Sequence, residues 1–482
     1  MPELNLSEIS HRAVSGVMVL TARKFVLKGV NYLGSIFLAR LLAPEIFGVF
    51  AIISFIITFF SFFSDIGLGA SLIQKKEKLT RQDLAVTFTL QQMLVLAVTL
   101  IIWLTAPIFS GKYNLGVQGI WLLRVFSLSL FLTSLKTIPS ILLERRLNFN
   151  RLIWPEAVEV VSFQVLAIAL ALQGYGVWSF IVALLVRSLL GAIALFWLSP
   201  WPVGFAWDKT ITRRLVSFGI PYNLNGFIAT IKDAVMPVFV GAVSGASAVG
   251  YLNWALTFSK LPILFMADIF RVTFPAYARI QDNPAVLKKA IEKTIRFTNL
   301  FLFPAALLLA ALARPIITII FTDKWLPALP AFYIHLTGII IVGITNTFMD
   351  ALWALGKTKI AIKLLLIYTL VNWGASVPLV YLFGFNGAMI GSVIVLYISL
   401  PLTWFYIRKI VKVEVIRHLW PAFTASILAG LFAYRLNFLA INLISLVFVG
   451  LTAGIVYLLL LLLLDRRHLL ADLAWVWGII RH

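Results

Sequence analysis

The sequence predicts an all-α integral membrane protein with about 14 transmembrane helices. Hydrophobic residues occupy 61% of the 482 positions and charged residues only 12%, whereas soluble globular domains are about 45–50% apolar and about 25% charged. The apolar residues also form runs that repeatedly reach the roughly 20 residues needed to cross a hydrocarbon core about 30 Å thick. These two observations exclude a soluble globular protein.

Apolar runs separated by short polar or basic loops predict the helices in order along the chain. The expected spans are 14–40, 47–70, 84–109, 115–143, 153–172, 176–198, 215–241, 247–274, 297–320, 328–355, 360–383, 387–407, 419–435 and 440–464. Two further segments, 283–296 and 469–480, each carry an apolar stripe, and both are predicted to rest on the membrane surface.

The net charge of +21 is explained by membrane topology. An even number of spans places both termini on the same side, and basic residues favour cytoplasmic loops. With both termini in the cytoplasm, the external loops hold only four of the 40 basic residues: Lys112, Arg314, Lys324 and Arg435. We therefore expect no nucleic-acid partner. The absence of cysteine excludes disulfides, thiolate metal ligands and cysteine catalysis, and we expect no metal site.

A weak internal repeat suggests two lobes. A shift of about 202 residues superposes residues 10–15 on 212–217 and Gly48 on Gly250. Each repeat holds six helices, so the two should share one orientation about a pseudo-twofold axis along the membrane normal. The predicted division is an N-terminal six-helix lobe (1–205), a C-terminal six-helix lobe (206–412), and two extra helices with an amphipathic cytoplasmic tail (413–482). Alternating access is the natural interpretation, with a duplicated static channel as the alternative.

Three segments carry a resemblance to a known family: Arg40–Phe50 (RLLAPEIFGVF), Ser64–Gly69 (SDIGLG) and Phe274–Asp282 (FPAYARIQD). They resemble the polysaccharide transporter family, the Wzx-like lipid-linked oligosaccharide flippases of the multidrug/oligosaccharidyl-lipid/polysaccharide (MOP) flippase superfamily. The resemblance implies export of oligosaccharide repeat units on undecaprenyl pyrophosphate across a bacterial inner membrane, for O-antigen, lipopolysaccharide or exopolysaccharide synthesis. It also implies contact with membrane lipids and with a polysaccharide polymerase.

Cationic side chains within the predicted spans are candidates for binding the substrate. A charge at mid-bilayer costs about 2.5–3.5 kcal/mol on insertion scales, so such a residue normally faces a partner or a hydrated cavity. Arg and Lys in a cavity can replace the hydration shell of a pyrophosphate. We hypothesise that one cavity is lined by Arg23, Lys24, Lys28, Asn31 and Arg124.

Simpler interpretations stand beside this hypothesis. Arg23 and Lys24 could extend to the inner membrane surface. Arg187 in the sixth span could simply pair with Glu156 or Glu159, two carboxylates of the fifth.

Four titratable residues are weaker candidates for coupling transport to Na⁺ or H⁺, and no other cofactor is expected: Asp233, Asp268, Asp350 and His335. Two of the acids have a structural alternative, because Lys232 adjoins Asp233 and Arg271 lies one helical turn after Asp268. The membrane potential alone is an equal alternative as the driving force.

Other functions fit the sequence less well. A membrane glycosyltransferase or ligase would need acidic residues on a substantial loop, and every predicted loop is short and poor in acids, so an enzyme is not expected. A cation-coupled multidrug exporter of the same superfamily is the main rival, although cationic drugs would be repelled by the first-helix cations. A noncatalytic scaffold would not need buried charge.

Overall fold

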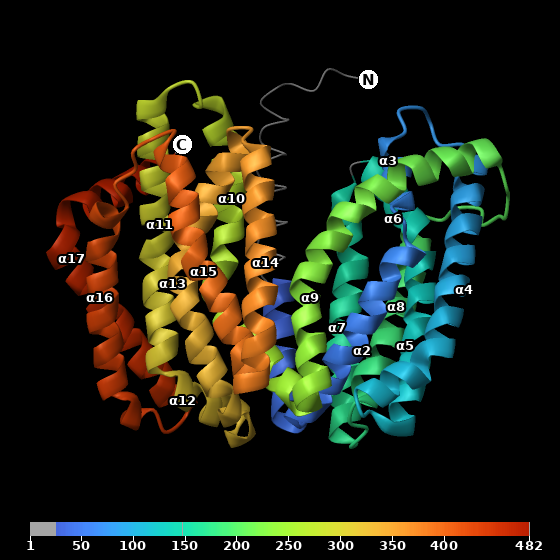
Figure 1. Cartoon of the computed structure of the whole chain (residues 1–482), viewed down its shortest axis with the longest axis horizontal. Coiled ribbons are helices and arrows are strands. Elements are labelled where there is room, and N and C mark those ends of the chain that lie inside the picture. The colour runs from blue at the N-terminus through green and yellow to red at the C-terminus, as the bar shows by residue number, and fades with distance from the viewer. Residues whose placement is uncertain (1–25, 147, 482) are drawn as a thin grey trace. The chain divides into compact units, whose positions relative to one another are not determined.

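A computed structural model describes residues 26–146 and 148–481, in which every regular element is helical (Figure 1). The chain divides into two compact units, Met1–Val249 and Gly250–His482. The all-α prediction is confirmed. The predicted lobe limits at 205/206 and 412/413 stay a prediction.

The first unit contains a helix at 26–41 and then a series of helices along the chain. They are α2 (Pro44–Ser64), α3 (Leu68–Gln74), α4 (Arg81–Lys112), α5 (Gly116–Leu135), α6 (Thr137–Arg145), α7 (Phe149–Leu172), α8 (Trp178–Leu198) and most of α9 (Lys209–Ser259).

The second unit continues from the end of α9. Its elements are η1 (Leu261–Phe265), α10 (Met266–Arg279), α11 (Pro284–Ala311), α12 (Ala313–Ile316), η2 (Ile317–Phe321), η3 (Asp323–Ala328), α13 (Leu329–Ala354), α14 (Thr358–Phe383), α15 (Phe385–Arg408), α16 (Val415–Arg435), η4 (Asn437–Leu439) and α17 (Leu443–Arg481).

Twelve helical segments of the described residues are long and apolar enough to cross a membrane. They correspond to every expected span except 14–40 and 215–241. The span expected over 14–40 begins before the first described residue. The span expected over 215–241 lies in α9, where many side chains are not described. A multi-pass membrane protein is therefore confirmed, and the count of 14 stays a prediction.

The N-terminus of α4 is held by Asp83, a carboxylate that is 1% exposed. Asp83 and Thr80 form a reciprocal capping box at the start of the helix. The same carboxylate accepts hydrogen bonds from Lys75, in the preceding loop, and from Arg214 on α9, both at 2.6 Å. One carboxylate thus fixes the loop and the start of α9 against α4.

The span expected over 47–70 is not continuous, which corrects the sequence prediction. It ends at Ser64, and α3 begins at Leu68 after Gly67, whose φ of +80° is accessible mainly to glycine. Helix α9 packs against this break so closely that a Cβ on Gly67 would lie 2.4 Å from the carbonyl oxygen of Gly219. Asn223 of α9 donates to the carbonyl oxygens of Phe62 (3.0 Å) and Asp65 (2.6 Å), which satisfies groups released by the break.

Two more expected spans are interrupted. The helix predicted over 115–143 divides at Lys136 into α5 and α6. The helix predicted over 247–274 ends at Ser259, and the 3₁₀ helix Leu261–Phe265, with Pro262 in its first turn, separates it from α10. Proline lacks the N–H that a continuing α-helix requires, which explains this second break.

The prediction of a separate surface helix over 283–296 is wrong. It is the first half of α11, which starts at Asn283 and Pro284 as expected but continues unbroken to Ala311. Its apolar stripe, Leu287, Ile291 and Ile295, is fully buried in the core of the second unit. On the opposite face, Lys288 bonds to Glu414 at 3.0 Å.

We predict that Gly67→Ala destabilises the protein more than Gly174→Ala. Both glycines have φ near +80°, but a Cβ on Gly174 would meet no atom within 4 Å. Gly174→Ala should therefore lower the free energy of unfolding only by the strain of an alanine in a left-handed backbone, roughly 1 kcal/mol. Gly67→Ala also forces α9 outward and should lower it by about 3 kcal/mol in total. Melting temperatures in detergent test this expectation, and equal losses for the two variants would contradict the close packing.

A polar cavity in the first unit as candidate functional site

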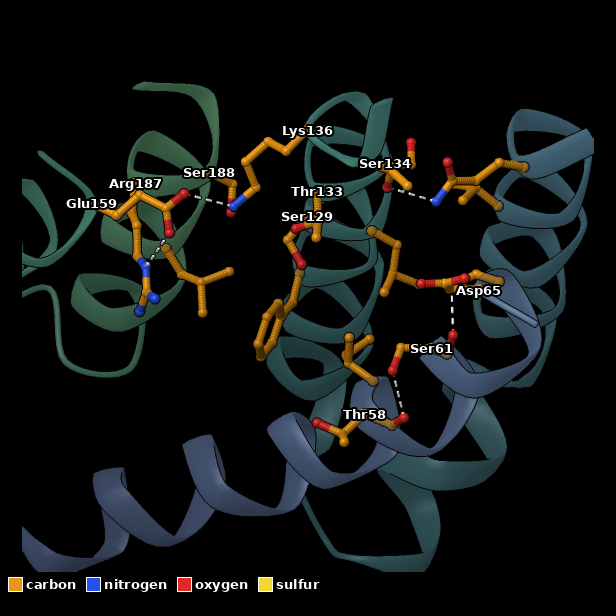
Figure 2. Close-up of a pocket in the computed structure, with 18 residues that line it drawn as sticks. Thr58, Ser61, Asp65, Ser129, Thr133, Ser134, Lys136, Glu159, Arg187 and Ser188 are labelled. Atoms are coloured by element: carbon orange, nitrogen blue, oxygen red, sulfur yellow. Dashed lines mark hydrogen bonds and ion pairs between the residues drawn. The ribbon is translucent and has the colours of Figure 1, made fainter. Parts of the chain in front are cut away.

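The first unit contains a half-open cavity of about 460 Å³ among its membrane-spanning helices (Figure 2). Its size lies in the range of roughly 300–1,000 Å³ that is usual for small-molecule sites. The lining comes from α2 and its C-cap, α4, α5, the α5–α6 break, α6, α7 and α8: Ile57, Thr58, Ser61, Ser64, Asp65, Gln91, Val95, Phe126, Ser129, Leu130, Thr133, Ser134, Lys136, Thr137, Glu159, Leu184, Arg187 and Ser188.

One wall holds a three-residue ionic network. Glu159 of α7 accepts a hydrogen bond from the Lys136 ammonium at 2.7 Å and another from Arg187 Nε of α8 at 3.3 Å. The side chains of Lys136 and Glu159 are only 17% and 13% exposed. Two cations thus share one carboxylate inside the bundle, an arrangement that lowers the cost of charge within a membrane.

The packing of α7 against α8 places Glu159. A Cβ on Gly191 of α8 would clash with Glu159 Oε1, so a larger residue there would displace this carboxylate. The Arg187 guanidinium carbon lies 5.9 Å from the ring centre of Phe163, one turn beyond Glu159 on α7. The sequence alternative in which Arg187 pairs with Glu159 is confirmed.

Hydroxyl and amide groups form much of the remaining lining. Ser61 and Ser64 donate their hydroxyl protons to main-chain carbonyl oxygens of α2, at 2.7 and 2.8 Å. Gln91 of α4 is 2% exposed and donates to Thr137 Oγ1 at 2.9 Å, while its Oε1 accepts no hydrogen bond from any described residue. Asp65 lies at the end of α2, apart from the ionic network (Figure 2).

A second cavity of about 310 Å³ adjoins the first. Both cavities are lined by Thr133, Lys136, Thr137 and Glu159. The second also contacts the carboxylates Glu144 and Glu156. The Lys136–Glu159 pair therefore lies on a wall that the two cavities share.

The structure describes three of the five residues in the predicted cationic cavity, Lys28, Asn31 and Arg124. Arg23 and Lys24 lie outside the described residues. Lys28 is exposed on the helix at 26–41, and Asn31 on the same helix accepts a hydrogen bond from Gln164 Nε2 at 3.0 Å. Neither cavity described above is lined by Lys28 or Asn31.

Arg124 lies on α5 beside two tryptophans. Its guanidinium carbon is 5.9 Å from the ring centre of Trp103 and 5.5 Å from that of Trp121, and it donates to the Trp103 carbonyl oxygen at 3.4 Å. It lines neither of the two cavities. The proposal that Arg124 shares one cavity with the first-helix cations stays a prediction.

Neither of the two cavities is lined by a candidate coupling residue. The side chains of Asp233 and Asp268 lie outside the described residues. In the second unit, Asp350 of α13 accepts a hydrogen bond from Thr273 Oγ1 at 2.7 Å, and buried His335 is hydrogen-bonded through Nδ1 to Ser259 Oγ at 2.7 Å. Their role in coupling stays a prediction.

Sequence reasoning missed most of the cavity lining. It identified Arg187 and Glu159 as charges within spans, but not the network that they form with Lys136. It did not single out Gln91 or the hydroxyl residues. The available signal was the presence of Gln, Ser and Thr at helical spacing in otherwise apolar spans, such as Ser61–Ser64 on α2.

The chain matches a family of known proteins. Residues 37–330 match the family described as "Polysaccharide biosynthesis protein". Similar curated proteins include the teichuronic acid biosynthesis protein TuaB of Bacillus subtilis, which is 26% identical over 62% of each chain, less than two thirds of TuaB. The succinoglycan biosynthesis transport protein ExoT of Rhizobium meliloti is 25% identical over 72% of this chain and 70% of ExoT. The lipopolysaccharide biosynthesis protein WzxC of Escherichia coli is 22% identical over 89% of this chain and 88% of WzxC.

Solved structures share the fold. The lipid II flippase MurJ in an inward closed conformation superposes with a TM-score of 0.77 and 16% identity, over 94% of this chain and 100% of MurJ. An inward-facing multidrug resistance MATE family transporter of the MOP superfamily gives a TM-score of 0.55 and 16% identity, over 79% of this chain and 93% of that one.

We predict that Glu159→Gln is more destabilising than Lys136→Gln. Removing the carboxylate leaves two cations unpaired and should cost about 3 kcal/mol, whereas Lys136→Gln leaves Glu159 with Arg187 and should cost about 1 kcal/mol. The double variant should lose at least about 1 kcal/mol less than the sum of the single losses, because both changes break the same pair. Thermal unfolding of the purified protein measures these losses.

Glu144→Gln is the matched control, because it also removes a carboxylate. The Glu144 carboxylate accepts a hydrogen bond from the Ser140 hydroxyl at 3.2 Å. Its effect should stay within about 0.5 kcal/mol. Strictly additive losses for Glu159→Gln and Lys136→Gln would contradict a shared network.

Proposed function

Because the chain belongs to the polysaccharide biosynthesis protein family, we propose that it is a flippase that translocates lipid-linked oligosaccharide from the inner to the outer leaflet of a bacterial inner membrane. The family match confirms the resemblance found in the sequence. The names of TuaB, ExoT and WzxC connect those relatives with the synthesis of cell-surface polysaccharides, and that of ExoT with transport.

One structural observation supports this proposal most directly. The first unit holds a polar, ionic cavity of about 460 Å³ between helices that are apolar enough to span a membrane. A sugar headgroup can leave water only if the transporter offers hydrogen-bonding groups along its path. The hydroxyls, the amide of Gln91 and the network around Glu159 supply such groups.

The pyrophosphate that joins the glycan to its carrier needs cations. We assign this role to the predicted set on the first helix and α5, Arg23, Lys24, Lys28, Asn31 and Arg124, because Arg and Lys form strong charge-assisted hydrogen bonds with phosphate oxygens. The polyprenyl tail would stay in lipid. This assignment is supported by residue chemistry and by the exposure of Lys28.

Further elements of the proposal concern the setting of transport. The two six-helix lobes, 1–205 and 206–412, would alternate access to the two sides, with residues 413–482 as an appendage. Both termini would lie in the cytoplasm, where the basic loops face anionic lipids. Asp233, Asp268, Asp350 and His335 are the candidate groups for coupling to Na⁺ or H⁺, and a polysaccharide polymerase would receive the product.

Leaflet transfer in proteoliposomes tests the proposed function. Undecaprenyl-pyrophosphate-linked oligosaccharide with a labelled glycan is placed on one face, and its appearance on the other is followed by an impermeant glycosidase. Transfer should require the protein and should fall at least about tenfold in Lys28→Gln, because a pyrophosphate oxygen loses a charged partner worth roughly 1.5–3 kcal/mol.

Lys112→Gln is the control, since Lys112 is an exposed lysine in the last turn of α4, and it should keep full transfer. Full transfer by Lys28→Gln would exclude that lysine from the path. Absence of transfer with several glycans, under imposed potential and Na⁺ or H⁺ gradients, would contradict the flippase and favour a cation-coupled drug exporter.

A further inference from the structure

The cavity in the first unit carries no surplus of positive charge. The cations in its lining are Lys136 and Arg187, and the carboxylates are Glu159 and Asp65, so their formal charges cancel. Both cations are already bonded to Glu159, at 2.7 and 3.3 Å. A pyrophosphate entering this space would have to compete with Glu159 for its partners and would approach the second carboxylate.

The lining is also rich in hydrogen-bond acceptors. The hydroxyls of Ser61 and Ser64 donate their protons to main-chain carbonyl oxygens, so toward a ligand these hydroxyl oxygens can only accept hydrogen bonds. The Oε1 of Gln91 is buried and accepts no hydrogen bond from any described residue. A buried acceptor without a donor is costly, at about 1–3 kcal/mol, and a ligand that donates to it would recover that cost.

Sugar hydroxyls match these groups, whereas phosphate oxygens do not. Each hydroxyl both donates and accepts, so it can satisfy an acceptor such as Gln91 and still receive a bond from Arg187. An ionised pyrophosphate only accepts. The apolar part of the lining, which includes Phe126 and Leu130, can contact the C–H faces of a sugar ring. A volume of about 460 Å³ suits a short stretch of glycan.

We propose, on the basis of the flippase function above, that this cavity binds uncharged sugar residues of the glycan and that the pyrophosphate is held elsewhere in the protein. Gln91 determines this preference because its Oε1 accepts a hydroxyl proton. Glu159 and Asp65 together balance the formal charges of Lys136 and Arg187, so an acidic sugar would add an unbalanced negative charge to the cavity. The cavity is thus a specificity site for the glycan and not a general anion site.

Binding to purified protein in lipid nanodiscs separates these possibilities. Three probes are compared: undecaprenyl pyrophosphate alone, the same carrier with a neutral hexose disaccharide, and the carrier with one hexose oxidised to a hexuronate. The neutral disaccharide should tighten binding about tenfold over the bare carrier, and the acidic one should not exceed the bare carrier. Equal affinity for all three, or tightest binding of the acidic probe, would overturn the proposal.

Two variants and one matched control assign the preference to the cavity. Gln91→Met should abolish the tenfold gain while leaving affinity for the bare carrier unchanged, and Ser129→Ala should reduce the gain. Gln92→Met is the control, because Gln92 is the adjacent buried amide, donates a hydrogen bond to Ser134 Oγ at 3.0 Å and does not line the cavity. A gain that survives in Gln91→Met and Ser129→Ala would place the sugar elsewhere. Failure to bind any probe would instead contradict the flippase function itself.

Discussion

The first unit depends on one constraint, which is that charge inside a membrane-spanning bundle must be paired or hydrated. Glu159 meets this constraint for two cations at once, Lys136 at the α5–α6 break and Arg187 near the middle of α8. Without the carboxylate, either cation would require water or another partner. With it, α5, α7 and α8 are held around a polar space whose formal charge is balanced.

Interruptions of helices create this space. The break after Ser64 turns the end of α2 toward the cavity, and the α5–α6 break presents Lys136 to Glu159. Carbonyl groups released at such breaks need donors, and Asn223 of α9 supplies them at the end of α2. The close contact of Gly67 with Gly219 then fixes α9 against the break. Packing and polar satisfaction therefore act together at the edge of the site.

Hydropathy predicted the all-helical membrane fold and most spans, because a run of about 20 apolar residues has few alternatives. It could not reveal the breaks, since Asp65–Gly67 and Lys136 interrupt an apolar window too briefly to end it. Periodicity correctly placed Leu287, Ile291 and Ile295 on one face of a helix. It could not tell whether that face meets lipid or protein, and here it meets the protein core.

The candidate site was predictable only in part, because it is assembled from six separate helices. The sequence identified the Arg187–Glu159 pair as one of two alternatives, while the contribution of Gln91 depends on a hydrogen bond to Thr137 that no local pattern encodes. The most direct test of the account exploits the absence of cysteine. Thr133 is exposed on the cavity wall, and Leu100 lies on the apolar surface of α4. Membranes that contain the Thr133→Cys or the Leu100→Cys variant are treated with a hydrophilic maleimide. The account predicts rapid labelling at residue 133, protection by undecaprenyl-pyrophosphate-linked oligosaccharide, and no labelling at residue 100; labelling at 133 that the lipid-linked glycan leaves unchanged would contradict it.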